Sequence, residues 1–313
     1  IERQIMATLR PLSAELRHIA ETELHEVEER VPADLQALRD WIAKQPHLKC
    51  RQDDQFLVAF LRGCKFSLEK AKSKLDSFFT IKTMMPELFA NRQMDERNIA
   101  LCRTGTYVRL PKPFGAAGPR IQLTNYSNFD PKVFKLIDLF RYQTLLMERQ
   151  IREDDNCVVS GYIEILDLGS MSLSFLAQID LPLVKKMGVF GEKAAPSRVK
   201  GIHFINCPKE AAALLNLAKS LMPAKLQSRF YVYKNLEKLN EVIPREYLPE
   251  EYGGSNGRIA DIIINMEKEL LEYNEYLKED NQYGVNEQLR PGKRLNADTV
   301  FGIEGSFRKL DID

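Results

Sequence analysis

Few residues of this chain could carry acid–base, nucleophilic or metal chemistry. Its four histidines and five cysteines are widely spaced, and no two cysteines form a CxxC pair. An odd number of scattered cysteines argues against a disulfide framework or a zinc site and is typical of a reducing compartment. Glu164 and Asp167 stand near the end of a predicted strand, where α/β proteins often place their sites, but no nucleophile or metal ligand accompanies them. His203 alternates with apolar residues on another predicted strand, and we interpret it as a packed, hydrogen-bonded core histidine.

The catalytic and phosphate-binding motifs of common enzyme classes are also absent. The sequence contains no GxSxG elbow, no GxxxxGK[ST] loop, no GxGxxG turn and no HExxH helix. The run GGSNG at 253–257 has the composition of a phosphate loop, but it does not follow a strand, so a turn is the better interpretation. The sequence therefore predicts no enzyme, no cofactor and no metal site.

The composition is that of a globular protein with room for about two domains. Of 313 residues, 44% are hydrophobic and 28% charged, and 45 basic residues nearly balance 44 acidic ones. This balance does not favour a nucleic-acid partner. No apolar run approaches the roughly 20 residues of a membrane span, and the first residues lack the apolar core of a signal peptide. We therefore expect a cytoplasmic protein.

The near-neutral total conceals two segments of opposite charge. Residues 185–234 hold ten basic and two acidic side chains, whereas residues 235–285 hold twelve acidic and five basic ones. A concentrated basic segment indicates either a directed contact with an anionic surface or ordinary solvated helix faces. Composition alone does not separate these two interpretations.

The first 100 residues predict helices. Asp53 is placed to cap a helix over 54–62, which carries an apolar stripe, and Ser67 is placed to cap another over 68–83. No strand is expected before Thr104. This pattern indicates a helical N-terminal domain.

From residue 105 onward, short apolar runs alternate with helical patterns. Strands are predicted over 106–110, 120–125, 157–167, 199–206 and 230–233, and helices over 130–152, 172–191, 210–222, 235–243 and 259–277. Strand, helix and strand at this spacing form a βαβ unit, so the fold class is α/β. The residues that follow read as a polar tail.

Three segments resemble the CRAL-TRIO family of lipid-transfer proteins. The segment 54–82, DQFLVAFLRGCKFSLEKAKSKLDSFFTIK, is similar to the helical domain that precedes the family's lipid-binding fold. The segment 196–208, PSRVKGIHFINCP, resembles its basic strand, and 248–254, LPEEYGG, resembles its closing segment. The three occur in the family's order and spacing over roughly residues 30–280.

The resemblance implies a fold, a domain organisation and a function. A helical N-terminal domain (1–100) precedes a CRAL-TRIO α/β sandwich (101–280), whose sheet floors an apolar pocket closed by a mobile helix, and a polar tail (281–313) follows. The implied function is an intracellular carrier that binds one tocopherol-, retinoid- or similar terpenoid-like lipid and exchanges it at membranes. The alternative is a lipid-sensing protein that recruits a protein partner, through 259–277 or the acidic tail, without transferring lipid. The oligomeric state stays open.

Comparison with the tocopherol-transfer branch implies a set of pocket residues. The gate corresponds to 210–222, where a stripe that includes Ala218 would face the pocket, and Leu215 and Met222 would face the bilayer when the gate opens. The expected lining residues are Phe140, Gln143, Met147, Tyr162, Leu166, Leu183, Met187, Phe190, Ile202, Leu214, Leu217 and Leu221.

The same resemblance gives the basic segment a role. Tocopherol- and retinaldehyde-binding members carry a cationic cleft for a phosphoinositide headgroup, which implies reversible association with phosphoinositide-bearing membranes. Many members have an arginine where this chain has Cys64, and the adjacent lysine is expected to substitute for it. The matching basic residues are Lys65, Arg198, Lys200, Lys225 and Arg229.

Gly201 is informative about the cargo. Members that transfer phosphatidylinositol itself carry a lysine at this position. The glycine therefore favours a neutral terpenoid- or retinoid-like lipid over phosphatidylinositol.

Overall fold

The N-terminal third of the protein is helical, as expected. The computed structural model describes residues 9–169, 171 and 173–302. Asp53 caps its helix through a hydrogen bond from the Phe56 amide at 3.0 Å, whereas Ser67 occupies the cap position of the next helix without such a bond. The helices of this region are α1 (Ala14–Leu24), η1 (Glu28–Arg30), α2 (Val31–Ala43), α3 (Asp54–Gly63), α4 (Leu68–Met84), α5 (Pro86–Phe89) and α6 (Glu96–Arg103).

An aromatic cluster forms the core of these helices. The rings of Phe56 and Phe60 on α3 lie 5.0 Å apart, and Phe78 on α4 lies 5.4 Å from Phe60. Phe78 also lies 5.8 Å from Phe190, which belongs to the following α/β region. The helical region therefore shares its core with the rest of the molecule.

The α/β region is built on a five-stranded sheet in the order β2-β3-β4-β5-β6. β2 pairs with β3 in antiparallel fashion, and the other neighbouring strands are parallel. This confirms the predicted α/β class with a helical N-terminal region. The strands are β2 (Tyr107–Arg109), β3 (Arg120–Asn125), β4 (Tyr162–Asp167), β5 (Val199–Ile205) and β6 (Phe230–Val232).

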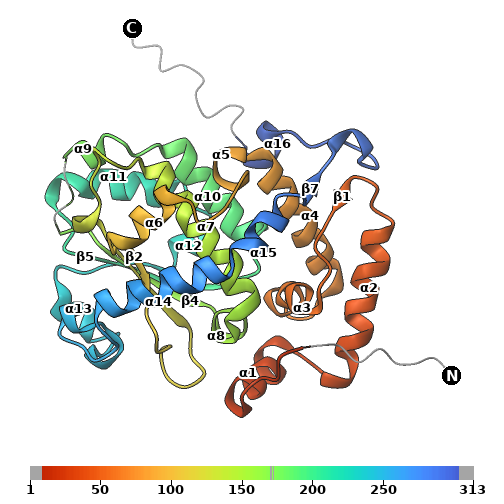
Figure 1. The fold of residues 1–313 in the computed structure, drawn as a ribbon, viewed down its shortest axis with the longest axis horizontal. Coiled ribbons are helices and arrows are strands. Elements are labelled where there is room, and N and C mark those ends of the chain that lie inside the picture. Colours follow the sequence, from red (N-terminus) through yellow and green to blue (C-terminus); the bar gives the residue numbers. More distant parts are fainter. Residues whose placement is uncertain (1–8, 170, 172, 303–313) are drawn as a thin grey trace, which may run out of the picture.

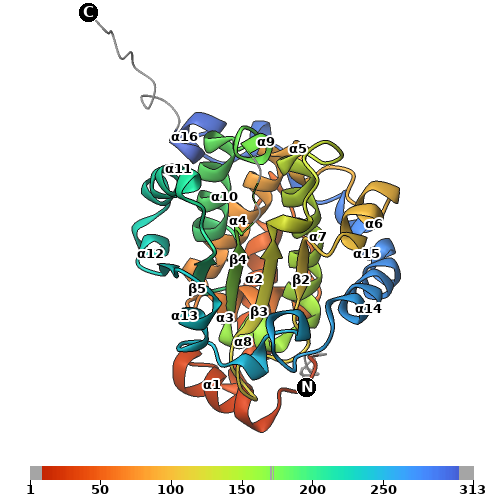
Figure 2. The same ribbon diagram turned by 90° about the vertical axis from the view of Figure 1, so that its left-hand side faces the viewer.

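Helices cover both faces of the sheet (Figures 1 and 2). One face looks toward α7, α10 and α11, and the other packs against α13, α14 and the segment between them. The helices after β3 are η2 (Tyr126–Asn128), α7 (Leu136–Glu153), α8 (Asp155–Ser160), α9 (Leu173–Leu176), α10 (Leu181–Lys193), α11 (Lys209–Ser220), α12 (Ala224–Gln227), α13 (Leu236–Asn240), η3 (Arg245–Tyr247), η4 (Glu250–Tyr252), α14 (Ile259–Glu272) and α15 (Asn274–Asp280).

The strand predicted over 157–167 is wrong in its first half. Asp154 caps the short helix α8 by accepting a hydrogen bond from the Cys157 amide at 3.0 Å, and β4 begins only at Tyr162. Gly161 separates the two elements at φ +86°, a conformation that glycine adopts without strain. Periodicity failed because a fully buried helix and a fully buried strand give the same apolar run.

The described part of the C-terminal segment is folded onto the protein. β7 (Gly284–Val285) pairs with β1 (Leu48–Lys49), a short strand that the sequence did not predict. After η5 (Glu287–Leu289), helix α16 (Ala297–Phe301) packs on α10, where Lys186 lies 5.6 Å above the Phe301 ring. The described part of the polar tail therefore packs against both the N-terminal helices and the α/β region.

Four buried charges join the two regions. Lys82 on α4 and Arg92 after α5 both contact Glu148 on α7, at 3.2 and 2.8 Å, and both also contact Asp280 on α15. All four side chains are almost fully buried. Burial would raise the pKa of Asp280, but the charges of Lys82 and Arg92 outweigh it and hold that pKa below its usual value.

Replacing Asp280 with Asn should destabilise the protein strongly. The change leaves two buried cations facing one carboxylate, which costs about 3–5 kcal/mol in the free energy of unfolding measured with urea. Because its pKa is lowered in the folded state, Asp280 contributes stability that is present above its unfolded pKa of 3.8 and is lost as pH falls through its folded value.

The matched control is Glu241→Gln, which removes an exposed ion pair with Lys238 that is 2.8 Å long. This control should change the free energy of unfolding by less than about 1 kcal/mol. Equal effects of the two substitutions would show that the buried cluster does not couple the two regions.

Candidate functional site

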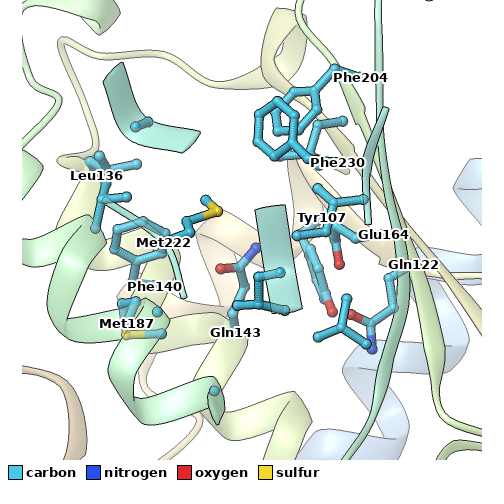
Figure 3. A pocket seen from close by; sticks show the side chains of 18 of the residues that line it. Tyr107, Gln122, Leu136, Phe140, Gln143, Glu164, Met187, Phe204, Met222 and Phe230 are labelled. Atoms are coloured by element: carbon cyan, nitrogen blue, oxygen red, sulfur yellow. The ribbon is translucent and has the colours of Figure 1, made fainter. Parts of the chain in front are cut away.

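An apolar cavity of about 350 Å³ lies between the sheet and helices α7, α10 and α11. Its size falls in the range of small-molecule sites. Figure 3 shows Phe140, Met187 and Met222 across the cavity from Tyr107 and the strands. The cavity is thus enclosed by helices on one side and by the pleated face of the sheet on the other.

Most of the residues expected to line a pocket lie on this wall. The helices α7, α10 and α11 and the strands β4 and β5 present them to the same space, although they come from separate parts of the chain. Those on the wall are Phe140, Gln143, Met147, Tyr162, Leu166, Met187, Phe190, Ile202 and Leu214. Whether they contact a ligand stays a prediction.

Leu183 does not lie on the wall of this cavity. On α10, Val184, Met187, Gly188 and Gly191 face the cavity as a stripe at three- and four-residue spacing, and Phe190 also lines it. Leu183 precedes this stripe by one position and packs instead with the core of the N-terminal helices. The assignment of Leu183 is therefore corrected.

The predicted stripe on α11 also requires correction. The wall is formed by Ala211, Leu214, Leu215, Ala218 and Met222. The helix is thus turned so that small alanines face the sheet. Leu215 and Met222, which were expected to point away from the pocket, line it.

Two leucines of that stripe face elsewhere. Leu217 is 47% exposed, and Leu221 is absent from the cavity wall. The segment packs instead through Leu215 and Met222, which contact the cluster that contains Phe204 and Phe230 of the sheet.

The cavity wall contains a polar region that the pocket prediction missed. Figure 3 shows Tyr107, Gln122 and Glu164 together against the strands. Gln122 on β3 is paired in register with Glu164 on β4. Strand alternation was an available signal, because Glu164 stands between Tyr162 and Leu166, two predicted pocket residues, and must share their face.

Glu164 has an unusual environment. Its Oε1 accepts a hydrogen bond from the Thr124 hydroxyl at 2.7 Å. Burial raises the pKa of Glu164 to about 8, although the Thr124 hydrogen bond acts in the opposite direction. The side chain is therefore mostly a neutral acid at pH 7.

A basic cluster lies at the start of β5. Lys200 is placed at an irregularity in the β4–β5 register, where Tyr162 pairs with Val199 and Ile163 pairs with Gly201. Burial lowers the pKa of Lys200, as do the neighbouring charges of Arg198, Arg229 and Lys65. These four cations are therefore close enough to interact.

Backbone carbonyls and one carboxylate hold this cluster. Arg198 donates to the Val159 carbonyl, and Arg229 donates to the Val199 carbonyl. Glu23 from α1 approaches Lys200 at 3.9 Å.

Lys225 is placed beside Lys74, whose pKa is lowered first by burial and also by the charge of Lys225. Of the five predicted basic residues, four thus form one cluster, while the fifth interacts with a neighbouring lysine.

The cavity and the basic cluster share strand β5. Val199 and Ile202 line the cavity, whereas Arg198 and Lys200 belong to the cluster. An apolar compartment and a cationic surface are therefore only a strand apart. The side chains that line the cavity and those that form the basic cluster are different ones.

His203 is a core residue, as we interpreted it from the sequence. It is buried, its Nδ1 lies 3.1 Å from the Tyr233 hydroxyl, and burial lowers its pKa to about 4. A Cβ added at Gly201 would lie 2.3 Å from His203 Nε2. The presence of glycine at 201 therefore has a local steric reason.

Asp167, the second carboxylate of the predicted pair, has a structural role. Asp167 accepts hydrogen bonds from the Tyr252 hydroxyl at 2.8 Å and from the Asn206 side chain at 2.9 Å. Within the described residues, no group of His, Cys, Asp and Glu could hold a metal ion. No described helix is long and apolar enough to cross a membrane.

Comparisons with known proteins identify the two regions. Residues 111–254 match the family profile described as the CRAL/TRIO domain, and residues 27–99 match the one described as Pinta-like, UBA domain. Clavesin-1 of Pongo abelii is 29% identical over 247 residues, covering 78% of this chain and 69% of that protein. Alpha-tocopherol transfer protein-like of Mus musculus is 28% identical over 250 residues, covering 79% and 72%. A solved structure, "Crystal structure of Sfh5", aligns with a TM-score of 0.48 and 14% identity, covering 84% of this chain and all of that one.

The orientation of α11 can be tested with two single substitutions. Leu214→Asp places a charge in the apolar wall and should lower the free energy of unfolding by more than about 3 kcal/mol. Leu217→Asp, on the same helix but exposed, should change it by about 0.5 kcal/mol or less. Urea unfolding of the two variants checks this expectation. A larger effect at Leu217 would instead favour the orientation of α11 that was predicted from the sequence.

Proposed function

Since the chain carries a CRAL/TRIO domain, we propose that it binds one molecule of a hydrophobic lipid in the cavity and exchanges it at membranes that bear phosphoinositides. The cargo would be tocopherol-, retinoid- or similar terpenoid-like. The observation that carries this proposal is the enclosed, largely apolar cavity beneath α11. One relative supports it, since its name, alpha-tocopherol transfer protein-like, refers to the transfer of a lipid.

The position of α11 supports its role as the gate. The helix contributes Leu214, Ala218 and Met222 to the cavity wall while exposing Leu217 on its outer side. Moving it away from the sheet would open the cavity without breaking any strand pairing. Leu217 then replaces Leu215 and Met222 as the residue proposed to meet the bilayer.

The basic cluster is the proposed landing site. Lys65, Arg198, Lys200 and Arg229 concentrate positive charge beside a single carboxylate, Glu23. A multiply phosphorylated headgroup offers several acceptor oxygens to such a cluster, and its charge exceeds that of one carboxylate. The interaction is expected to weaken with salt, because the cluster is only partly buried.

A cavity-filling variant tests the carrier function. Ala218→Trp should displace the cargo, because residue 218 lines the cavity, whereas Ala213→Trp on the exposed side of the same helix should not. Native mass spectrometry of the purified proteins, with extraction of any released lipid, is the measurement. One lipid per chain in the wild type and Ala213→Trp, and none in Ala218→Trp, is the expected result. A wild-type protein that stays empty when offered tocopherols, retinoids, carotenoids and sterols would refute the proposal.

Binding to phosphoinositides should depend on the basic cluster. Replacing Arg198 and Lys200 with Ala should weaken binding to phosphatidylcholine vesicles containing phosphatidylinositol bisphosphate by roughly 30-fold, at about 1 kcal/mol per cation. Binding of the cavity lipid in solution should be nearly unchanged. Glu23→Gln should act in the opposite direction and strengthen vesicle binding, because it removes the carboxylate that competes with phosphate.

The control for charge is the double replacement of Lys268 and Lys278 with Ala, which removes two exposed cations of α14 and α15. Vesicle sedimentation at several salt concentrations compares the variants. Equal losses in the cluster and control variants, or equal loss of vesicle and cavity-lipid binding, would contradict a separate headgroup site.

A second candidate is a lipid-sensing protein that recruits a protein partner. It is favoured by the outer surface of α14, where Ile264 is 66% and Leu271 43% exposed. Recovery of a stoichiometric protein partner, together with no transfer of lipid between vesicles, would support this candidate over a carrier.

A further inference from the structure

The polar groups of the cavity are concentrated around Glu164. Thr124 donates to its Oε1 at 2.7 Å, and the phenol groups of Tyr107, Tyr126 and Tyr162 are near enough for the charge of Glu164 to raise the pKa of each, after the larger effect of burial. These groups come from β2, β3, β4 and η2. One side of an otherwise apolar cavity is thus lined with hydroxyl and carboxyl groups.

Within the ranges that the structure describes, the hydrogen bond between Thr124 and Glu164 is the one that joins side chains of this cluster. Among the described residues, Thr124 is the only side chain that hydrogen-bonds Glu164, and it uses only Oε1. No hydrogen bond joins the hydroxyls of Tyr107, Tyr126 and Tyr162 to other described side chains, although all three residues line the cavity. These three hydroxyls and Glu164 line the cavity, so a polar group of an occupant can hydrogen-bond to them.

The cavity has no cation to balance a charged occupant. Its lining residues, in the part of the chain that the structure describes, include no lysine, arginine or histidine, and Glu164 is the one carboxylic acid among them. A phosphate or carboxylate placed beside Glu164 would be buried without a counterion. The cations near this end of β5 belong to the cluster outside the cavity.

We propose that Glu164, in its protonated form, donates a hydrogen bond to an oxygen acceptor of a neutral lipid and so selects cargo that carries a carbonyl or similar uncharged oxygen group. This inference rests on the proposed carrier function and adds to it the chemical class of the cargo's polar end. The protonated carboxyl is a good donor because its second oxygen already accepts from Thr124, so the O–H is free to face the cavity.

The proposal predicts that selection depends on pH in a defined direction. Because burial raises the pKa of Glu164 to about 8, the acid is protonated at pH 7 and ionised well above pH 8. A carboxylate accepts hydrogen bonds but donates none. The preference for a lipid with a carbonyl over the matching hydrocarbon should therefore fall as pH rises. The affinity for the hydrocarbon reports only the contribution of the apolar side chains and serves as the reference.

The experiment compares 2-heptadecanone with heptadecane, each delivered to the full chain from cyclodextrin, with bound probe quantified after gel filtration. In the wild type, the ketone should bind roughly tenfold better than the hydrocarbon at about pH 7, as expected for one buried hydrogen bond, and this ratio should fall severalfold at about pH 9.5. Glu164→Gln keeps an N–H donor of similar shape and should retain the ratio at both pH values. Glu164→Leu should lose it at both.

The control variant is Glu241→Gln, which removes an exposed carboxylate that does not line the cavity and should behave as the wild type. A ketone preference that is independent of pH in the wild type, or that survives in Glu164→Leu, would overturn the proposal. The Glu164→Gln pH profile decides the question even if the leucine variant does not fold. Heptadecane bound as well as the ketone would refute this inference alone, whereas retention of neither probe would refute the carrier function as well.

Discussion

The buried cluster of Lys82, Arg92, Glu148 and Asp280 is the interaction on which the rest of the structure depends. Two positive and two negative charges meet where α4, α7 and α15 converge, and each charge is placed among partners of opposite sign. An apolar core tolerates sliding of one helix on another, but buried charges lose their compensation if any helix shifts. The cluster therefore fixes α7, and with it one wall of the cavity, relative to the N-terminal helices.

This rigidity contrasts with the opposite wall of the cavity. α11 faces the sheet across the cavity with apolar side chains, of which Leu215 packs near Phe204 and Phe230, and it takes part in no buried ion pair among the described residues. Such contacts are weaker per residue and have no fixed geometry, which suits an element that must separate from the sheet and return. The wall formed by α7 is fixed by buried ion pairs, whereas the wall formed by α11 is held by apolar side chains.

Much of the fold was predictable because its signals are local. Asp53 before a helix and the apolar run over 199–206 predicted elements that the structure contains. The predictions failed where the deciding information is tertiary: α8 was read as strand because Cys157 and its neighbours are buried on all sides, and β1 exists only because β7 pairs with it.

The same division holds for the cavity. Phe140 and Ile202 lie on its wall as predicted, whereas the rotation of α11 was not predicted, because it depends on the packing of Leu215 and Met222 against residues distant in the sequence. Glu164 was noticed for its chemistry, but its neutral form follows only from burial that no spacing in the sequence reveals.

The contact between Gly201 and His203 has a consequence for how this protein can evolve. Any side chain at position 201 collides with the imidazole, which is itself stacked on Tyr231 and Tyr233. A lysine at 201 requires the imidazole of His203 to shift out of its stack, and a change at 203 by itself gives up the packed aromatic stack. The two substitutions are therefore epistatic, and the route to a protein with an added cation at this strand passes through a less stable intermediate. A single stacked histidine thus restricts which side chains position 201 can accept by one mutation of the present sequence.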